Sequence, residues 1–569
     1  MAANGQTEDT RPPSIPVSGW PIRDLASPPI AATLPDRWAS YSHGGQKNIR
    51  EKLRVNLPVD GRQRRTAGLA GDIDPAAGET SGSPASMLPA EAGGFARFIR
   101  SPHGTSTTGD RIASPLGQIS WAMFDFARVP YVLLITIYIF APYFAHTLVA
   151  GDPVRGQALW GDIQAASGLI IALIAPFIGA ISDAGGRRKP WIAVFALLIA
   201  IPSLLLWYAK PDGAGLTLLE IGALVAIANV AFEFASVFFN AMLPTIATHA
   251  RIGSLSGLSL ALGNASGLAL LIFILVAFAL PGHVDWSFIP AHPLFGIDQA
   301  THEPDRLVGP IAALCIFIFT VPLLLFTPDR AKGTLGWREA SIAGVRSVIR
   351  TLRSLKHYRN AATYLAARLF FNDGMTAVLV FGGVYAAGIF HWNTLAMTAY
   401  GIILSVFAVI GGFVGGWLDD RFGSKTAIFV SVGGTLVILL LSISMGPDRI
   451  FWFIHVDPNA PPINSLPFFH TWPEIIYLCI VIVNAIFITA SYANARTMMA
   501  RIAPVERMTE FFGLFSLSGQ STSFLATSSV AVMTVLTHSQ RGGMIAVATF
   551  LLLGLIGMFW VREERATAV

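Results

Sequence analysis

Long apolar segments recur along the chain from residue 117 onward, each about the length of a membrane-crossing helix. A helix needs about 20 mostly apolar residues to cross the hydrocarbon core of a bilayer. Length and apolarity predict about twelve such spans. The first six are expected at Gly117–Val149, Trp160–Ser182, Trp191–Ala209, Leu218–Asn240, Leu255–Leu280 and Leu307–Phe326. The second six are expected at Ala362–Phe390, Ala396–Leu418, Thr426–Met445, Glu474–Met499, Phe511–Leu536 and Met544–Val561.

Polar residues interrupt this pattern near the start of the first span in each half. Asp125 and Arg128 lie in the first span, and Arg368, Asn372 and Asp373 lie at similar depth in the seventh. A charge at that depth is costly, so it usually faces a bundle interior or an aqueous cavity. The recurrence in both halves predicts a transporter built from repeats.

Lys and Arg gather in alternate loops and in the connection Thr327–Asn360. Such a bias marks the cytoplasmic side, and an even number of spans puts both termini there too. The expected plan is a cytoplasmic tail (1–112), a six-helix bundle (113–326), a cytoplasmic linker with a surface helix (327–361), a second six-helix bundle (362–561) and a cytoplasmic C-terminus (562–569).

Composition supports a membrane protein with a polar N-terminal tail. The 569 residues are 53% hydrophobic and 13% charged, about half the charged fraction of a soluble domain. Residues 1–112 are rich in Pro, Gly, Ala, Ser and Arg without sustained periodicity, which predicts disorder. The basic stretch Lys47–Arg65 is either a solvated linker or a weak attractor of anionic lipid.

The loops after the second and eighth spans share one pattern. GAISDAGGRRKP and GWLDDRFGSK both read Gly, three residues, Asp, two residues, Gly, and then basic residues. An Asp at a helix end can hold basic groups or the N-terminus of a neighbouring helix. Simple anchoring of the loop is compatible with this pattern, and conformational switching is what the family resemblance described next implies. The candidate switch residues are Gly179, Asp183, Arg187, Arg188, Gly416, Asp420, Arg421, Gly423 and Lys425.

These paired loops resemble the loop signature of the major facilitator superfamily, in which such residues control switching and do not touch substrate. Three further segments narrow the resemblance: Trp121 to Ala127, Asn372-Asp373-Gly374 followed by FGGVYAAGIF, and Arg507 to Phe515 with Gly519 and Ser523 beyond it. Together they resemble the vacuole-effluxer family, named for fungal vacuolar amino-acid efflux proteins and including bacterial members. The resemblance implies a monomer that moves an amino acid or another small polar metabolite. It also implies the plasma (inner) membrane if the protein is bacterial, or the vacuolar membrane if it is fungal. Arg128 and Gln520 depart from the family pattern.

Buried polar residues are the candidates for substrate or ion binding. Asp125 and Arg128 are three residues apart and can pair, or Arg128 can bind a carboxylate or phosphate of the substrate. Glu233 lacks a basic partner on its own helix, so it, Asp125 or Asp373 could carry a proton. Polar contacts are expected from Asn240, Arg368, Asn372 and Arg496.

We therefore predict an all-α polytopic membrane protein acting as a secondary active transporter of a small polar solute. Its substrate would lie near the midplane between spans 1, 4, 7 and 10, with alternating access and proton coupling. A cation-coupled sugar or drug carrier, a non-transporting receptor or scaffold, and an intramembrane enzyme are the alternatives. The expected partners are the substrate, membrane lipid and protons, without nucleic acid.

Catalysis and resident cofactors are not expected. The chain has no GxxxxGKS phosphate loop and no Ser/His/Asp constellation, so ATP hydrolysis and enzymatic chemistry lack a sequence basis. His283, His292 and His302 are irregularly spaced and form no metal motif. Cys315 and Cys479 lie inside predicted spans, which argues against a disulfide framework.

Overall fold

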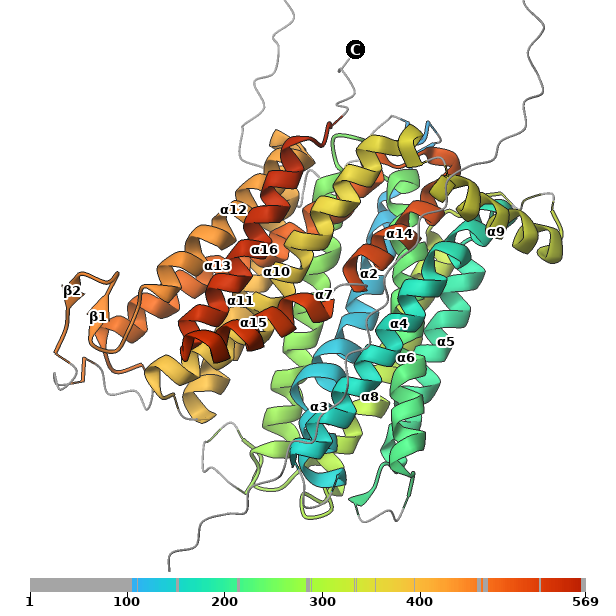
Figure 1. Ribbon diagram of the computed structural model, residues 1–569. Helices are drawn as coiled ribbons and strands as arrows, with labels where there is room; N and C mark the ends of the chain where they lie inside the picture. The colour runs from blue at the N-terminus through green and yellow to red at the C-terminus, as the bar shows by residue number, and fades with distance from the viewer. Residues whose placement is uncertain are drawn as a thin grey trace, which may run out of the picture. The chain divides into compact units, whose positions relative to one another are not determined.

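The computed structural model describes residues 105–563, apart from 110, 150–152, 212–214, 283–286, 288, 332, 334, 354, 393, 458–461, 464–468 and 521–522 (Figure 1). The first half contains α2 (Pro115–Pro130), η1 (Tyr131–Tyr138), α3 (Phe140–Tyr143), η2 (Phe144–Leu148), α4 (Pro153–Gly185), α5 (Lys189–Leu205), η3 (Leu206–Tyr208), α6 (Leu218–Ile246), α7 (Ile252–Ile274), η5 (Leu275–Ala279), η6 (Leu294–Gly296) and α8 (Glu303–Phe326). The linker contains α9 (Trp337–Arg353) and η7 (Leu355–Tyr358). The second half contains α10 (Arg359–Phe390), α11 (Thr394–Phe422), α12 (Ser424–Ile443), β1 (Arg449–Ile450), β2 (Ile454–His455), α13 (Trp472–Ile502), η8 (Val505–Arg507), α14 (Met508–Gln520), α15 (Ser523–Thr537) and α16 (Gln540–Phe559).

The helices have the length and surface of membrane spans. Within the described residues, 11 helices are long and apolar enough to cross a bilayer. Their outer faces are apolar, as Leu169 and Leu173 show on α4, where each is 62% exposed. A soluble protein rarely exposes such continuous apolar surface. The predicted all-α polytopic fold is therefore confirmed.

One predicted span is described in two segments. The segment expected as a single helix, Phe511–Leu536, is described as α14 and α15, with residues 521–522 between them outside the described part of the chain. Arg368 of α10 donates to the carbonyl oxygen of Phe515 at 2.7 Å, and Asn372 donates to that of Gly519 at 3.4 Å. The Gly519 carbonyl is among the last four of α14, which lack partners within a helix, whereas Phe515 lies further inside α14. The two hydrogen bonds therefore join α10 to the second half of α14.

The two halves repeat at the level of single hydrogen bonds. After α8, Asp329 accepts hydrogen bonds from the backbone N–H groups of Arg188 and Lys189 at the start of α5. After α16, Glu563 accepts from the backbone N–H groups of Ser424 and Lys425 at the start of α12. In each half, a carboxylate that follows the last helix therefore caps the third helix, where helix N-termini favour negative charge.

The halves contact each other mainly through two helix pairs, α4 with α14 and α7 with α11. Glycines allow the backbones to approach closely in both. A Cβ added to Gly513 would lie 2.5 Å from the carbonyl oxygen of Ala175, and one added to Gly416 would lie 2.8 Å from that of Gly253. Small residues at such crossings are the usual means of tight helix packing in membranes.

Most of the predicted N-terminal tail, residues 1–104, lies outside the described residues. The end of the predicted range contacts the loop after α6. Thr107 donates to the carbonyl oxygen of Ala247 through its backbone N–H at 3.0 Å and its hydroxyl group at 3.1 Å. This contact places residues 105–109 against the first bundle.

Candidate functional site

The two repeated loops place carboxylates on helix starts in the opposite half. Asp183, near the end of α4, accepts a hydrogen bond from the backbone N–H of Glu510 in α14 at 2.9 Å. Asp420, near the end of α11, accepts from the backbone N–H groups of Gly253 and Ser254 in α7 at 2.8 and 2.9 Å, and from the Ser254 hydroxyl. Because helix N-termini carry partial positive charge, each half holds a helix start of the other. We call this end of the molecule the motif end.

Cations complete the contact at Asp183. Arg188 lies 3.4 Å and Arg330 lies 3.6 Å from its carboxylate. Arg188 also donates to the Thr509 hydroxyl at 2.9 Å and to the Ala241 carbonyl at 2.8 Å. Burial lowers the pKa of Arg188 to about 10, so this guanidinium stays charged at neutral pH. Arg188 therefore connects α4, α6 and α14 through one side chain.

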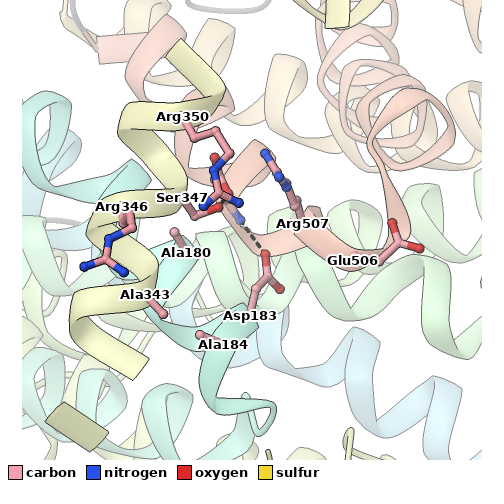
Figure 2. Close-up of a pocket in the computed structure, with 10 residues that line it drawn as sticks. Ala180, Asp183, Ala184, Ala343, Arg346, Ser347, Arg350, Glu506 and Arg507 are labelled. Atoms are coloured by element: carbon pink, nitrogen blue, oxygen red, sulfur yellow. Dashed lines mark hydrogen bonds between the residues drawn. The ribbon is translucent and has the colours of Figure 1, made fainter. Parts of the chain in front are cut away.

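The linker helix α9 lies beside this contact (Figure 2). Ser347 of α9 donates to the Glu510 carboxylate at 2.8 Å, and Arg507 donates to the Thr351 hydroxyl at 2.7 Å. A cavity of about 330 Å³ opens between α9, α4 and the start of α14. Its polar lining comprises Asp183, Arg346, Ser347, Arg350, Glu506, Arg507 and Glu510.

A second set of charges lies further inside the bundle. Arg128 donates from Nε to Asp125 Oδ1 at 2.8 Å, so the pair expected from their spacing is present. Arg496 of α13, in the other half, lies 3.2 Å from Asp125 Oδ2. Ser259 of α7 donates to the same carboxylate. Asp125, Arg128 and Arg496 form what we call the central charge cluster, in which one carboxylate faces two guanidinium groups.

Hydrogen bonds and aromatic rings surround the two guanidinium groups of the cluster. Arg496 donates to the Ser256 carbonyl at 2.6 Å, the Ser256 hydroxyl at 2.9 Å and the Asn240 side chain at 3.4 Å. Its Cζ lies 5.4 Å from the Trp121 ring centroid, and that of Arg128 lies 4.5 Å from the Phe232 centroid. Rings at such distances attract cations, which offsets part of the cost of burying them.

Arg368 is the centre of another group of predicted residues. Besides its bond to Phe515, it donates to the Ser518 hydroxyl at 2.7 Å and to Asn372 at 3.3 Å. Glu233 from the first half and Asp373 from its own helix both interact electrostatically with it. Like the central charge cluster, this group combines residues of both halves.

Comparison with known proteins identifies the family. Residues 162–568 match the family described as Vacuole effluxer Atg22 like. The chain belongs to this family. The MFS-type transporter YxiO of Bacillus subtilis (strain 168) is 21% identical over 460 residues, covering 79% of this chain and 96% of YxiO. Autophagy-related protein 22-1 of Neosartorya fischeri is 24% identical over 271 residues, covering 46% of this chain and 42% of the fungal protein.

Solved structures show the same fold. The major facilitator superfamily transporter FucP, in its outward conformation, superposes with a TM-score of 0.57 at 13% identity, covering 79% of this chain and 99% of FucP. A bacterial homologue of the iron transporter ferroportin, in an outward-facing state, gives a TM-score of 0.55 at 10% identity, covering 78% and 98% of the two chains. The Atg22-like chain is thus a multi-pass membrane transporter with the major facilitator fold. The 11 candidate spans of the described residues, together with the segments α14 and α15, fit the twelve helices and two repeats of that fold. The predicted family resemblance is confirmed.

The structure places the remaining candidate switch residues at the motif end of this Atg22-like transporter. Arg187 and Arg421 are exposed, and Arg421 lies 5.8 Å from the Phe422 ring. Lys425 donates to the carbonyl oxygen of Val561 at 2.7 Å. Gly423 precedes α12 with a φ of 87°, a left-handed conformation that favours glycine.

Several residues of the motif end were missed by the sequence reasoning. Asp419, beside the motif Asp420, is 1% exposed and accepts hydrogen bonds from Ser424, Thr497 and Arg501. Its position next to Asp420 was the sequence feature that could have indicated its role at the motif end. In the central region, Ser256 and Ser259 were also missed, although they lie three residues apart on one face of an apolar helix.

Proposed function

We propose that this Atg22-like transporter is a secondary active carrier of small polar solutes, with amino acids as the substrate class. The motif end, whose loops carry the excess of Lys and Arg, is the cytoplasmic side, and both termini lie there. The carrier alternates between two states as one half rocks against the other. Its family supports a solute effluxer, since the name given to the family is that of a vacuole effluxer.

The central charge cluster is the observation that carries this proposal. Asp125 has one negative charge, while Arg128 and Arg496 have two positive charges, and all three side chains are at least nine-tenths buried. An excess cation in a poorly solvated site favours a further anion. The carboxylate of an amino acid suits a guanidinium, which binds carboxylates through two parallel hydrogen bonds.

Proton coupling is the second part of the proposal, and the same geometry supports it. Arg496 belongs to the second half and Asp125 to the first, so the pair must separate or rearrange when the halves move apart. A proton on Asp125 removes its attraction for both guanidinium groups and leaves them to the substrate carboxylate. Glu233, which interacts with Arg368 from the first half, and Asp373, which lies on the same helix as Arg368, are further candidates for carrying the proton. Asn240 and Asn372 supply polar contacts to the solute.

Uptake and exchange of labelled amino acids in proteoliposomes test the proposal. We expect the protein to accumulate an amino acid when a proton gradient is imposed. Asp125→Asn should lower this accumulation at least tenfold while retaining exchange without a gradient. Asp448→Asn, the same chemical change at a carboxylate 40% exposed in the loop after α12, is the matched control.

Two results would contradict the proposal. Gradient-driven accumulation by Asp125→Asn at the level of the parent protein would remove Asp125 from coupling. If sugars or organic cations were transported and amino acids were not, in the same vesicles, the protein would be a sugar or drug carrier instead.

A further inference from the structure

The linker helix α9 has two faces of different character. Ala340, Val348 and Thr351 are at most 3% exposed on the inner face. Gly344 lies on this face too, where a Cβ would come within 2.6 Å of the backbone nitrogen of Ile181 in α4. With the hydrogen bond from Ser347 to Glu510, these contacts fix α9 against the ends of α4 and α14.

The outer face of α9 is apolar and exposed. Ile342 is 58% exposed, Val345 is 40% exposed and Ile349 is 42% exposed. Their spacing of three and four residues puts them on one side of the helix. Leu335, just before the helix, adds a further apolar side chain that is 42% exposed. Such a strip is unexpected on a helix surrounded by water.

Arginines flank this apolar strip on the same exposed surface. α9 contains one acidic residue, Glu339, and four arginines. The arginines are all exposed: Arg338, Arg346, Arg350 and Arg353. A helix with an apolar face bordered by arginines typically lies in the plane of a membrane, with its apolar side chains at the boundary between headgroups and acyl chains. Guanidinium groups bind phosphate bidentately, so the arginines select anionic headgroups.

The position of α9 along the chain agrees with this environment. α9 packs against Ile181, in the last turns of a candidate span that ends at Gly185. It is followed almost directly by α10, another candidate span. α9 therefore lies beside the ends of two candidate spans, which is where a helix of the headgroup region is expected.

We propose that α9 is an interfacial helix that binds anionic phospholipid headgroups of the cytoplasmic leaflet. Ile342, Val345 and Ile349 enter the headgroup boundary, and Arg338, Arg346 and Arg353 contact lipid phosphates. The leaflet assignment rests on the orientation in the proposed function. The lipid contact itself does not, because a nanodisc presents the same lipid on both sides.

The full-length protein in nanodiscs tests this proposal. An environment-sensitive fluorophore is attached at Leu335→Cys in a background where Cys315 and Cys479 are replaced by alanine. The protein is compared in phosphatidylcholine discs and in discs that also contain phosphatidylglycerol. We expect protection of the fluorophore from an aqueous quencher to increase with phosphatidylglycerol. Detergent-solubilised protein titrated with short-chain phosphatidylglycerol gives the affinity.

Charge variants test whether the arginines of α9, and not other cations at the motif end, bind the lipid. Replacing Arg338, Arg346 and Arg353 by glutamine should weaken phosphatidylglycerol binding by about fivefold per arginine, and so about a hundredfold in total. Replacing Lys356, Arg359 and Arg562 by glutamine is the matched control, because these cations are exposed at the motif end outside α9. The control should retain parental affinity.

The outcomes are distinct from those of the transport assay. Equal affinity for the two lipids, or an equal loss in both triple variants, would overturn the proposal. A signal that depends on protein concentration and not on lipid would show that a second copy of the chain covers the strip instead. A protein that binds phosphatidylglycerol through α9 but moves no solute would refute the proposed function alone.

Discussion

Neutralising Asp420 should open the motif end. The carboxylate accepts two backbone N–H groups, from Gly253 at 2.8 Å and from Ser254 at 2.9 Å. In Asp420→Asn, the amide oxygen can still accept one of them, but the amide nitrogen cannot accept the other. An unsatisfied N–H costs about 1–3 kcal/mol, and the lost interaction with the helix N-terminus adds up to about 1 kcal/mol. A total of about 2 kcal/mol shifts the equilibrium toward the open state about 30-fold.

Thiol labelling measures this shift. Ser256 is fully buried, and its hydroxyl donates to the Ala493 carbonyl of the other half at 3.0 Å, so separation of the halves must expose it. Ser256→Cys, in a background without the native cysteines, serves as the reporter in every variant. We expect maleimide to react about 30-fold faster in Asp420→Asn than in the parent.

Asp448→Asn is the matched control and should label at the parental rate. A labelling rate in Asp420→Asn within twofold of the parent, with folding retained, would refute the reasoning. It would mean that the carboxylate contributes equally to both states and that other contacts close this end.

Three further changes probe neighbouring contacts. Gly513→Val places side-chain carbon against the Ala175 carbonyl, so it should cost about 1–3 kcal/mol and speed labelling of the reporter, whereas an unchanged rate would deny that α4 and α14 must meet. Arg368→Met removes donors to the Phe515 carbonyl and the Ser518 hydroxyl of α14 and should lower stability by about 2 kcal/mol, seen as a lower melting midpoint; an unchanged midpoint would contradict a stabilising role for these hydrogen bonds. Glu563→Gln weakens the cap on α12 and the 2.7 Å ion pair with Arg501, so a smaller decrease of about 1 kcal/mol is expected, and a gain in stability would be inconsistent with it.

The positions of the spans could be predicted because bilayer thickness fixes the length of an apolar helix. The span expected at Leu218–Asn240 begins at the predicted residue and continues to Ile246 as α6. The contacts of the eleventh span could not be predicted, because its partner lies elsewhere in the chain. Arg368, on α10, donates to the Phe515 carbonyl of α14.

The candidate site, too, could be predicted only in part from the sequence. The Asp183 and Asp420 pattern indicated that each could hold a helix start, but sequence spacing does not reveal which helix lies opposite. The pairing of Asp125 with Arg128 follows from local helix geometry. The approach of Arg496 to Asp125, from 371 residues away, depends on the packing of two bundles and has no local signal.

The glycine contacts between the halves have a consequence for how the transporter moves. At Gly513 and Gly416, backbone lies directly against backbone, with no long side chain to stretch as the distance grows. An interface of this kind loses roughly a quarter to a half of its dispersion attraction within the first ångström of separation. Graded, partly separated arrangements are then unstable, and the molecule occupies discrete populations. Spin labels across this interface should give two separate distance peaks whose areas change with conditions, while the peak positions stay fixed.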